Sequence, residues 1–139
     1  MRRGDIKRAN GHLADALALY REARTTADAA LRADPANAGW QRDLSVLFNK
    51  IGDVFFAQRN LPEAEKNFRD ALTIMERLAG GDPGNAGWQY DLGITNERVG
   101  DVLGAQGNLA SAFDRYRVRH EIIERLSKSN PEIRPGVAI

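Results

Sequence analysis

The stretch that decides the fold occupies residues 34–41 and reads Asp-Pro-Ala-Asn-Ala-Gly-Trp-Gln. It returns at residues 82–89 as Asp-Pro-Gly-Asn-Ala-Gly-Trp-Gln, 48 positions later. The dipeptide Gly-Asp has the same spacing, at residues 4, 52 and 100, and residues 4–51 are identical to residues 52–99 at 17 of 48 positions. A fixed period of this length is typical of repeat architectures. The chain therefore divides into units 4–51, 52–99 and 100–139, the last of them incomplete.

Each unit contains two helical patterns separated by turn signals. Asn37 and Asn85 follow an Asp-Pro pair and are good N-caps, and the apolar residues after them recur with helical spacing. Glycine at positions 11 and 107 suits the left-handed conformation that ends a helix, whereas Arg59 stands there in the middle unit and predicts a corner that is slightly strained or differently closed. We expect no strands, a tail without regular structure at 130–139, and helices over about 2–10, 12–33, 37–58, 61–79, 85–106 and 109–128.

The composition is that of one soluble globular domain. The 139 residues carry 20 Lys and Arg against 19 Asp and Glu, which gives a net charge of +1. Such a balance does not favour nucleic acid, whose binding usually requires a larger basic excess. The chain has no cysteine and no apolar run long enough to span a membrane. Its first residues are followed by mixed charge and not by the apolar segment of a secretory signal. These absences exclude disulfides and thiolate catalysis, and we expect a cytoplasmic protein without membrane contact.

Small and aromatic residues recur at fixed places within the units. The pattern resembles the tetratricopeptide repeat, whose unit is a helical hairpin of 34 residues. Because the period here is 48, each helix is lengthened by seven residues, and the chain is similar to long-helix members such as those of kinesin light chains. In the third unit Arg119 stands where the last alanine is expected. The residues that carry the resemblance are Gly52, Ala64, Phe68 and Ala71 in the middle unit, Gly4, Ala16, Tyr20 and Ala23 in the first, and Gly100, Ala112 and Tyr116 in the third.

The resemblance implies an all-α fold, a right-handed superhelical α-solenoid of stacked antiparallel hairpins over residues 1–129, followed by the tail 130–139. It also implies that the first helices of the units line a concave groove for a peptide or partner helix. Our sequence-based hypothesis is therefore a non-enzymatic protein–protein interaction module. The residues that this register places in the groove are Arg42, Asp43, Val46, Asn49, Lys50, Asp53 and Phe56, then Tyr90, Asp91, Ile94, Glu97, Arg98 and Asp101, with Arg2, Asp5 and Arg8 in the first unit.

The charges of this stripe also have a purely structural interpretation. Lys50 precedes Asp53 by three residues, and Arg98 precedes Asp101 by the same interval, which predicts two local ion pairs along the helices. The aspartates recur from unit to unit and are expected to serve the scaffold. One subclass of the family clamps a C-terminal carboxylate, but an aspartate at position 53 would repel that group. We therefore do not expect the carboxylate clamp.

Nothing in the sequence predicts catalysis, a metal ion or a cofactor. Residues 120–124, His-Glu-Ile-Ile-Glu, contain the first half of the HExxH zinc motif but lack its second histidine. We interpret them as ordinary helix surface. Trp40 and Trp88 recur at the same position of two units, and we expect both to be structural core.

A second class of function stays open, a self-associating scaffold segment of a longer repeat protein. Repeat arrays need polar caps at both ends, and no further helical pattern follows residues 109–128. We expect a weak homodimer through the outer face of this terminal helix unless the tail covers it. RNA binding, a third class, is disfavoured because the groove mixes both signs of charge. The apolar residues that would form the dimer contact are Phe113, Tyr116, Ile122, Ile123 and Leu126.

Overall fold

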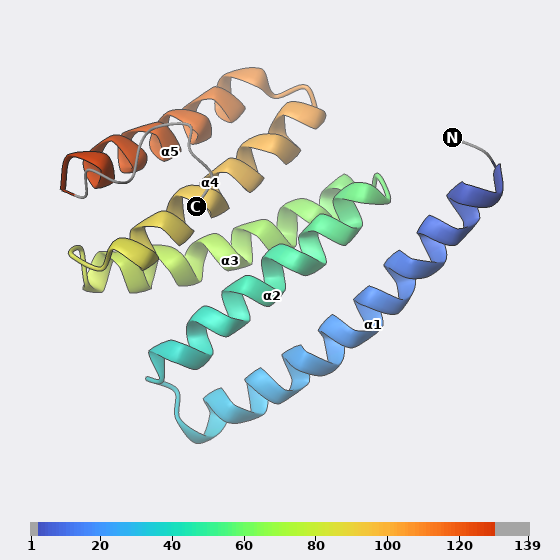
Figure 1. Ribbon diagram of the computed structural model, residues 1–139, viewed down its shortest axis with the longest axis horizontal. Coiled ribbons are helices and arrows are strands. Elements are labelled where there is room, and N and C mark those ends of the chain that lie inside the picture. The colour runs from blue at the N-terminus through green and yellow to red at the C-terminus, as the bar shows by residue number, and fades with distance from the viewer. Residues whose placement is uncertain (1–2, 130–139) are drawn as a thin grey trace.

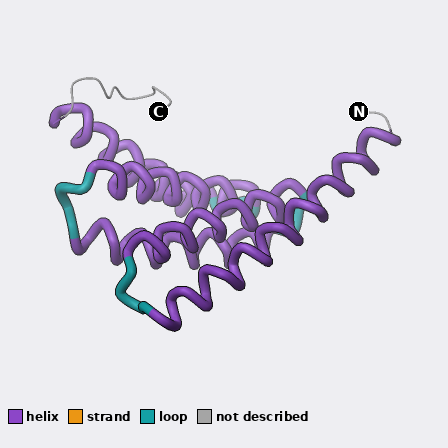
Figure 2. The backbone as a smooth tube through the Cα atoms, turned by 60° about the horizontal axis from the view of Figure 1, so that its bottom comes forward, coloured by secondary structure: helices purple, strands orange, loops and turns teal. Residues whose placement is uncertain are grey.

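The computed structural model describes the backbone of residues 3–129 and the side chains of residues 11–129. Five helices follow one another: α1 (Arg3–Ala33), α2 (Ala38–Ala57), α3 (Leu61–Gly81), α4 (Ala86–Ala105) and α5 (Leu109–Ser129). They form a layer of antiparallel neighbours, and their loops lie at its two ends (Figures 1 and 2). Residues 3–129 contain no strand. The all-α repeat solenoid is thus confirmed, its handedness stays a prediction, and the tail 130–139 lies outside the described residues.

Asparagine side chains fix the starts of α2 and α4 at equivalent positions of two units. Asn37 Oδ1 accepts a hydrogen bond from the Trp40 backbone N–H at 3.0 Å, and Asn85 Oδ1 accepts one from the Trp88 N–H at 3.0 Å. Each bond satisfies a backbone donor that has no partner within the first helical turn. The predicted N-caps are therefore confirmed.

The corners after α2 and α4 use the same left-handed residue position. Arg59 has φ of 62° and Gly107 has φ of 84°. The corner closes when the Asn60 N–H donates to the Phe55 carbonyl at 2.9 Å, and the Asn108 N–H repeats this bond to Leu103 at 2.9 Å. The two corners therefore close in the same way, which leaves strain at Arg59 as the remaining prediction, because a side chain is disfavoured in this conformation.

The break that we predicted near Gly11 is wrong, because α1 runs without interruption from residue 3 to residue 33. In the middle unit the chain turns where Phe55 and Phe56 pack against the core cluster. The first unit has Lys7 and Arg8 at the corresponding positions. The sequence of the first unit thus lacks the apolar pair that holds the folded-back helix in the middle unit, which gives a reason for the uninterrupted α1.

The core is centred on α3, whose buried face meets α4 on one side and α2 on the other. Phe68 and Met75 are 1% and 0% exposed, as the repeat pattern predicts. A second, smaller cluster joins the start of α4 to the end of α5. The central cluster consists of Ala64, Phe68 and Leu72 of α3, Val99, Val102 and Leu103 of α4, and Ala112 of α5.

The prediction that both tryptophans are core residues is wrong for Trp40. Its side chain is 36% exposed and lines a cavity between α1 and α2, whereas Trp88 is half-buried. The reason is positional, since α2 is the only neighbour of α1 among the helices of residues 3–129, and no further helix packs on α1 to cover Trp40.

Candidate functional site

The first helices of the second and third units, α2 and α4, lie together and enclose a groove of about 250 Å³, called here the α2–α4 groove. Side chains three and four positions apart on a helix share one face, and this spacing brings the predicted residues into one wall on each helix. Seven predicted residues line the groove: Val46, Asn49, Lys50 and Asp53 from α2, and Asp91, Ile94 and Arg98 from α4.

Three polar contacts join α2 to α4 along the groove. Arg42 Nε lies 2.9 Å from Asp91 Oδ2. Asn49 Nδ2 donates to Thr95 Oγ1 at 3.1 Å. At the far end, Arg98 Nε lies 2.9 Å from Asp53 Oδ1.

These contacts correct the predicted ion pairs along each helix. The pairs run between helices, because the α2–α4 packing brings Asp53 to Arg98, while Lys50 Nζ lies over the Tyr20 ring of α1, 5.7 Å from its centroid. The recurring aspartates 53 and 91 do serve the scaffold, as expected. The exposed ion pairs each contribute little to stability, so their main effect is to set the register of the two helices.

At one end of the groove, burial and ion pairing act in opposite directions on the pKa of Asp53. Burial raises the pKa of the Asp53 carboxyl above its ordinary value, and the neighbouring Arg98 guanidinium offsets this only in part. At the other end, the hydrogen bond to Asp91 raises the pKa of Arg42. Lys50 is exposed and has no ion pair with any residue of 11–129. The groove therefore offers the Lys50 ammonium, which has no ion pair within residues 11–129, beside the Asp53 carboxyl that is paired with Arg98.

One buried acceptor among the described groove residues is left without a hydrogen-bond donor. The Asn49 amide donates to Thr95, but its Oδ1 is buried and accepts no hydrogen bond from any described residue. A buried acceptor without a partner costs about 1–3 kcal/mol. It is a place where a ligand N–H or a water molecule would be stabilising.

Six predicted groove residues lie elsewhere. Arg42 and Asp43 line a cavity between α1 and α2, and Phe56 of α2 packs against the central core cluster. The side chains of Arg2, Asp5 and Arg8 lie outside the described residues.

The other three correct the sequence-based register on α4. Tyr90 packs against Ile122, Ile123 and Leu126 of α5. Glu97 lies 2.9 Å from Arg119 Nε, and Asp101 accepts a hydrogen bond from Tyr116 Oη at 2.6 Å. The physical reason is that α5 is the neighbour of α4 on this side, so Tyr90, Glu97 and Asp101 stabilise the terminal hairpin.

Two lining residues, Ser45 and Thr95, were missed by the sequence analysis. Ser45 donates to the Arg42 carbonyl at 2.7 Å and contacts Met75 Sδ at 3.2 Å, and Thr95 receives the Asn49 amide. Helical spacing could have found them, since Ser45 precedes Asn49 by four residues and Thr95 precedes Arg98 by three.

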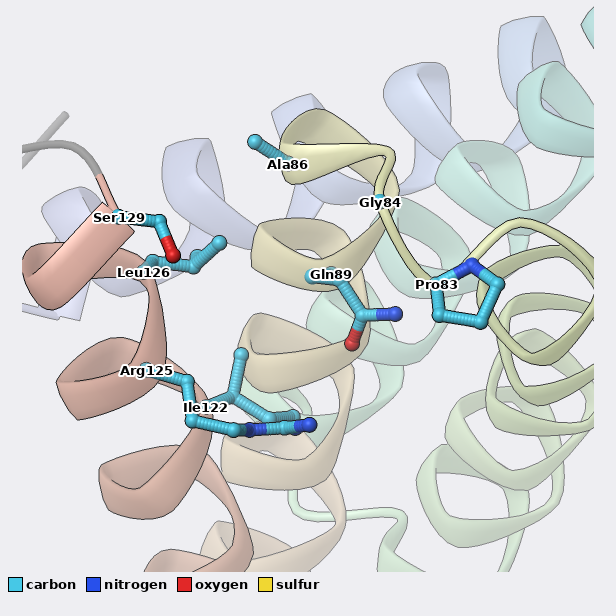
Figure 3. A pocket seen from close by; sticks show the side chains of 8 residues that line it. All are labelled: Pro83, Gly84, Ala86, Gln89, Ile122, Arg125, Leu126 and Ser129. Carbon is cyan, nitrogen blue, oxygen red and sulfur yellow. The ribbon is translucent and has the colours of Figure 1, made fainter.

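Two further cavities flank the groove. The larger, called here the α1–α2 cavity, has a volume of about 450 Å³. The smaller, of about 220 Å³, lies between the α3–α4 loop and the end of α5, where Gln89 also donates to the Ala79 carbonyl at 3.1 Å. Figure 3 shows its lining by Pro83, Gly84, Ala86, Gln89, Ile122, Arg125, Leu126 and Ser129.

The described residues offer no metal site. They contain no group of three His, Asp or Glu side chains close enough to hold an ion. His120 Nε2 lies 3.2 Å from Glu124 Oε1, and both side chains are exposed, as expected for helix surface. Across residues 3–129, every helix is too short or too polar to cross a bilayer.

Comparison with known proteins agrees with this architecture. A family model described as Tetratricopeptide repeat matches residues 43–125. No curated protein and no solved structure matches the chain. Tetratricopeptide repeats are in general protein–protein interaction modules without catalytic activity. The match spans more than half of the sequence and covers the groove, so the chain belongs to the tetratricopeptide repeat family.

Proposed function

We propose that the protein is a non-enzymatic interaction module that binds a peptide or partner helix in the α2–α4 groove. The observation that carries this proposal is the buried Asn49 Oδ1, an acceptor without a donor inside a groove lined on two sides. Groups of this kind are normally satisfied in folded proteins. A backbone or side-chain N–H of a ligand supplies the missing donor.

The lining defines the chemistry of that ligand. Val46 and Ile94 provide apolar surface from opposite walls, and Lys50 provides the exposed cation. The preferred segment therefore carries an apolar side chain next to an acidic one. Asp53 disfavours a terminal carboxylate at its end of the groove, so the segment is internal to its protein and is not held by its C-terminus.

A peptide-display selection on the immobilised full chain tests the proposal. Enriched peptides should bind the Asn49→Leu and Ile94→Ser variants about tenfold more weakly, with circular dichroism to verify folding. The matched control is Leu19→Ser on α1, a side chain that is 65% exposed and lies outside the groove. Amidation of the peptide C-terminus should not change its affinity. Peptides that bind all variants equally would argue against the groove.

A second candidate, self-association as a scaffold segment, is favoured by the outer face of α5. Leu109 and Phe113 are 70% and 67% exposed, and Tyr116 is 38% exposed. The predicted contact set is otherwise wrong, because Ile122, Ile123 and Leu126 are buried in the cluster with α4. We propose only a weak homodimer through the remaining residues. Sedimentation velocity over about a hundredfold range of concentration tests it, and Phe113→Ser should abolish any dimer observed.

A cytoplasmic location and a lack of nucleic-acid binding belong to the same proposal. They are supported by the sequence without cysteine and by the mixed charge of the groove. Fluorescence microscopy of a tagged full chain and titration with mixed RNA test the two points separately.

A further inference from the structure

Apart from Val46, the residues that line the α1–α2 cavity are not used by the function proposed for the groove. Its walls come from the last part of α1 and the first half of α2. They are largely apolar, and Trp40 stands among them with 36% of its side chain exposed. The lining residues are Ala23, Thr26, Ala27, Trp40, Arg42, Asp43, Val46 and Leu47.

The repeat shows what covers the equivalent surface one unit later. The counterparts of Ala27, Asp43 and Leu47, 48 positions on, are Met75, Asp91 and Thr95. Helix α2 covers all three. Ser45 Oγ lies 3.2 Å from Met75 Sδ, Arg42 Nε lies 2.9 Å from Asp91 Oδ2, and Asn49 Nδ2 lies 3.1 Å from Thr95 Oγ1.

Burial and charge mark the first copy of this surface as uncovered except at Ala27, which is 0% exposed like its counterpart Met75. Thr95 is 0% exposed, whereas its counterpart Leu47 is only half-buried. Ala71 is likewise 0% exposed, whereas its counterpart Ala23 is exposed. Asp91 has the Arg42 guanidinium, but Asp43 is exposed and forms no ion pair with residues 11–129.

We propose that the α1–α2 cavity docks an amphipathic helix of a partner protein, lying as α2 lies on α3 and α4. By analogy with Arg42, Ser45 and Asn49, the helix carries an arginine at position i facing Asp43 and a small residue at i+3 facing Ala27. Position i+7 is apolar, because it faces Leu47 where the next unit has the polar Thr95. This surface shares Val46 with the α2–α4 groove but does not depend on the function proposed for the groove.

A second copy of the chain is a poor source of this helix. Among the described helices, the pattern occurs on α2, where Arg42, Ser45 and Asn49 already contact α3 and α4. It also occurs on α1 as Arg24, Ala27 and Leu31, where Ala27 is buried and Arg24 lies over the Phe48 ring of α2. A second copy could supply either helix only by breaking contacts within its own fold.

The test uses a synthetic helical peptide that copies residues 38–57 with Asn49→Leu, its helicity verified by circular dichroism. Titrated into the labelled full chain, it should shift the amide resonances of Ala23, Ala27 and Leu47. Asp43→Lys in the chain should weaken binding about tenfold, and a peptide with Arg42→Glu should restore it. The matched control is the groove variant Ile94→Ser, which should bind the peptide as the native chain does.

Three outcomes would overturn the proposal. The first is an absence of binding by the helical peptide at about 0.5 mM. The second is binding that ignores the charge of residue 43 or that shifts Ile94 and Arg98 in place of Ala23 and Ala27. The third is a dimer of the free chain whose contact residues map to the α1–α2 cavity, since a second copy would then be the occupant.

Discussion

Gly52 and Gly100 are places where a single atom decides the packing of a hairpin. A Cβ added to Gly52 would lie 2.5 Å from Phe68 Cε1, and one added to Gly100 would lie 2.7 Å from Tyr116 Cε1. Both rings belong to the second helix of the same unit. The glycine lets the two helices approach closely enough for the ring to fill the space between them, which is why the small residue and the aromatic recur together.

Replacing Gly52 by alanine should therefore destabilise the protein. The ring of Phe68 is buried and cannot move aside freely, so we expect a loss of about 1–3 kcal/mol in the free energy of unfolding. Urea denaturation measures it. The control is Gly11→Ala, where a Cβ meets no atom within 4 Å and the helix should gain about 0.5–1 kcal/mol. Equal stabilities of the two variants would contradict this account of the close approach.

Tyr116 should make the stability sensitive to alkaline pH. Its hydroxyl donates to Asp101, and this bond together with partial burial raises the pKa of Tyr116 to about 12, from 10.0. Below pH 10 the phenol is protonated in the folded and unfolded chains, so the stabilisation is complete. As the pH rises from 10 to 12 the unfolded chain releases the proton first, and that stabilisation is lost.

Tyr116→Phe should remove this part of the decline in stability between pH 10 and 12, and Asp101→Asn should reduce it. Chemical denaturation at a series of pH values measures the effect. An unchanged alkaline slope in both variants would show that the hydrogen bond does not control the ionisation.

At the scale of the elements, the α2–α3 corner carries strain that the α4–α5 corner avoids. Both corners have positive φ at the same repeat position, but one uses Arg59 and the other Gly107. Arg59→Gly should raise the free energy of unfolding by about 1 kcal/mol, because glycine adopts this conformation without a steric penalty. The reciprocal variant Gly107→Arg should lower it by a similar amount. Thermal denaturation of both proteins provides the measurement, and a loss of stability in Arg59→Gly would refute the strain.

Helix ends could be predicted from sequence wherever a local hydrogen bond determines them. Asn37 and Asn85 cap the residues three positions later, so the signal lies within one turn. The end that we predicted at Gly11 failed because the corner depends on distant contacts, those of Phe55 and Phe56 with the core. Turn residues alone do not stop a helix when the folded-back segment has nothing to bury.

The groove residues, like the helix ends, could be predicted only where the signal is local in the sequence. Helical spacing placed Val46, Asn49, Lys50 and Asp53 correctly on one face. It could not show that Arg98 reaches Asp53 across the groove in place of Asp101 along its own helix, because that choice depends on how α2 and α4 pack. Nor could spacing show that Glu97 faces Arg119.

At the scale of the whole molecule, burial falls from the centre of the layer toward α1. Helix α3 has eight buried residues, whereas Ala27 is the only buried one among the α1 side chains that the structure describes, residues 11–33. Native-state hydrogen exchange should therefore be slowest in α3 and fastest in α1. Mass spectrometry of deuterated peptides measures it. Uniform protection across the five helices would show that the molecule opens only as one cooperative unit.

The order of contacts has a consequence for how the chain folds. Within the described helices, each packs on the next one in sequence, and only α2 and α4 also touch across an intervening helix. Contacts between near neighbours in sequence close small loops, which favours fast folding. A hairpin can therefore assemble during translation as soon as its second helix has left the ribosome. The Arg42–Asp91 and Asp53–Arg98 pairs form only after α4 has been synthesised, so they would lock the register of two hairpins that are already folded.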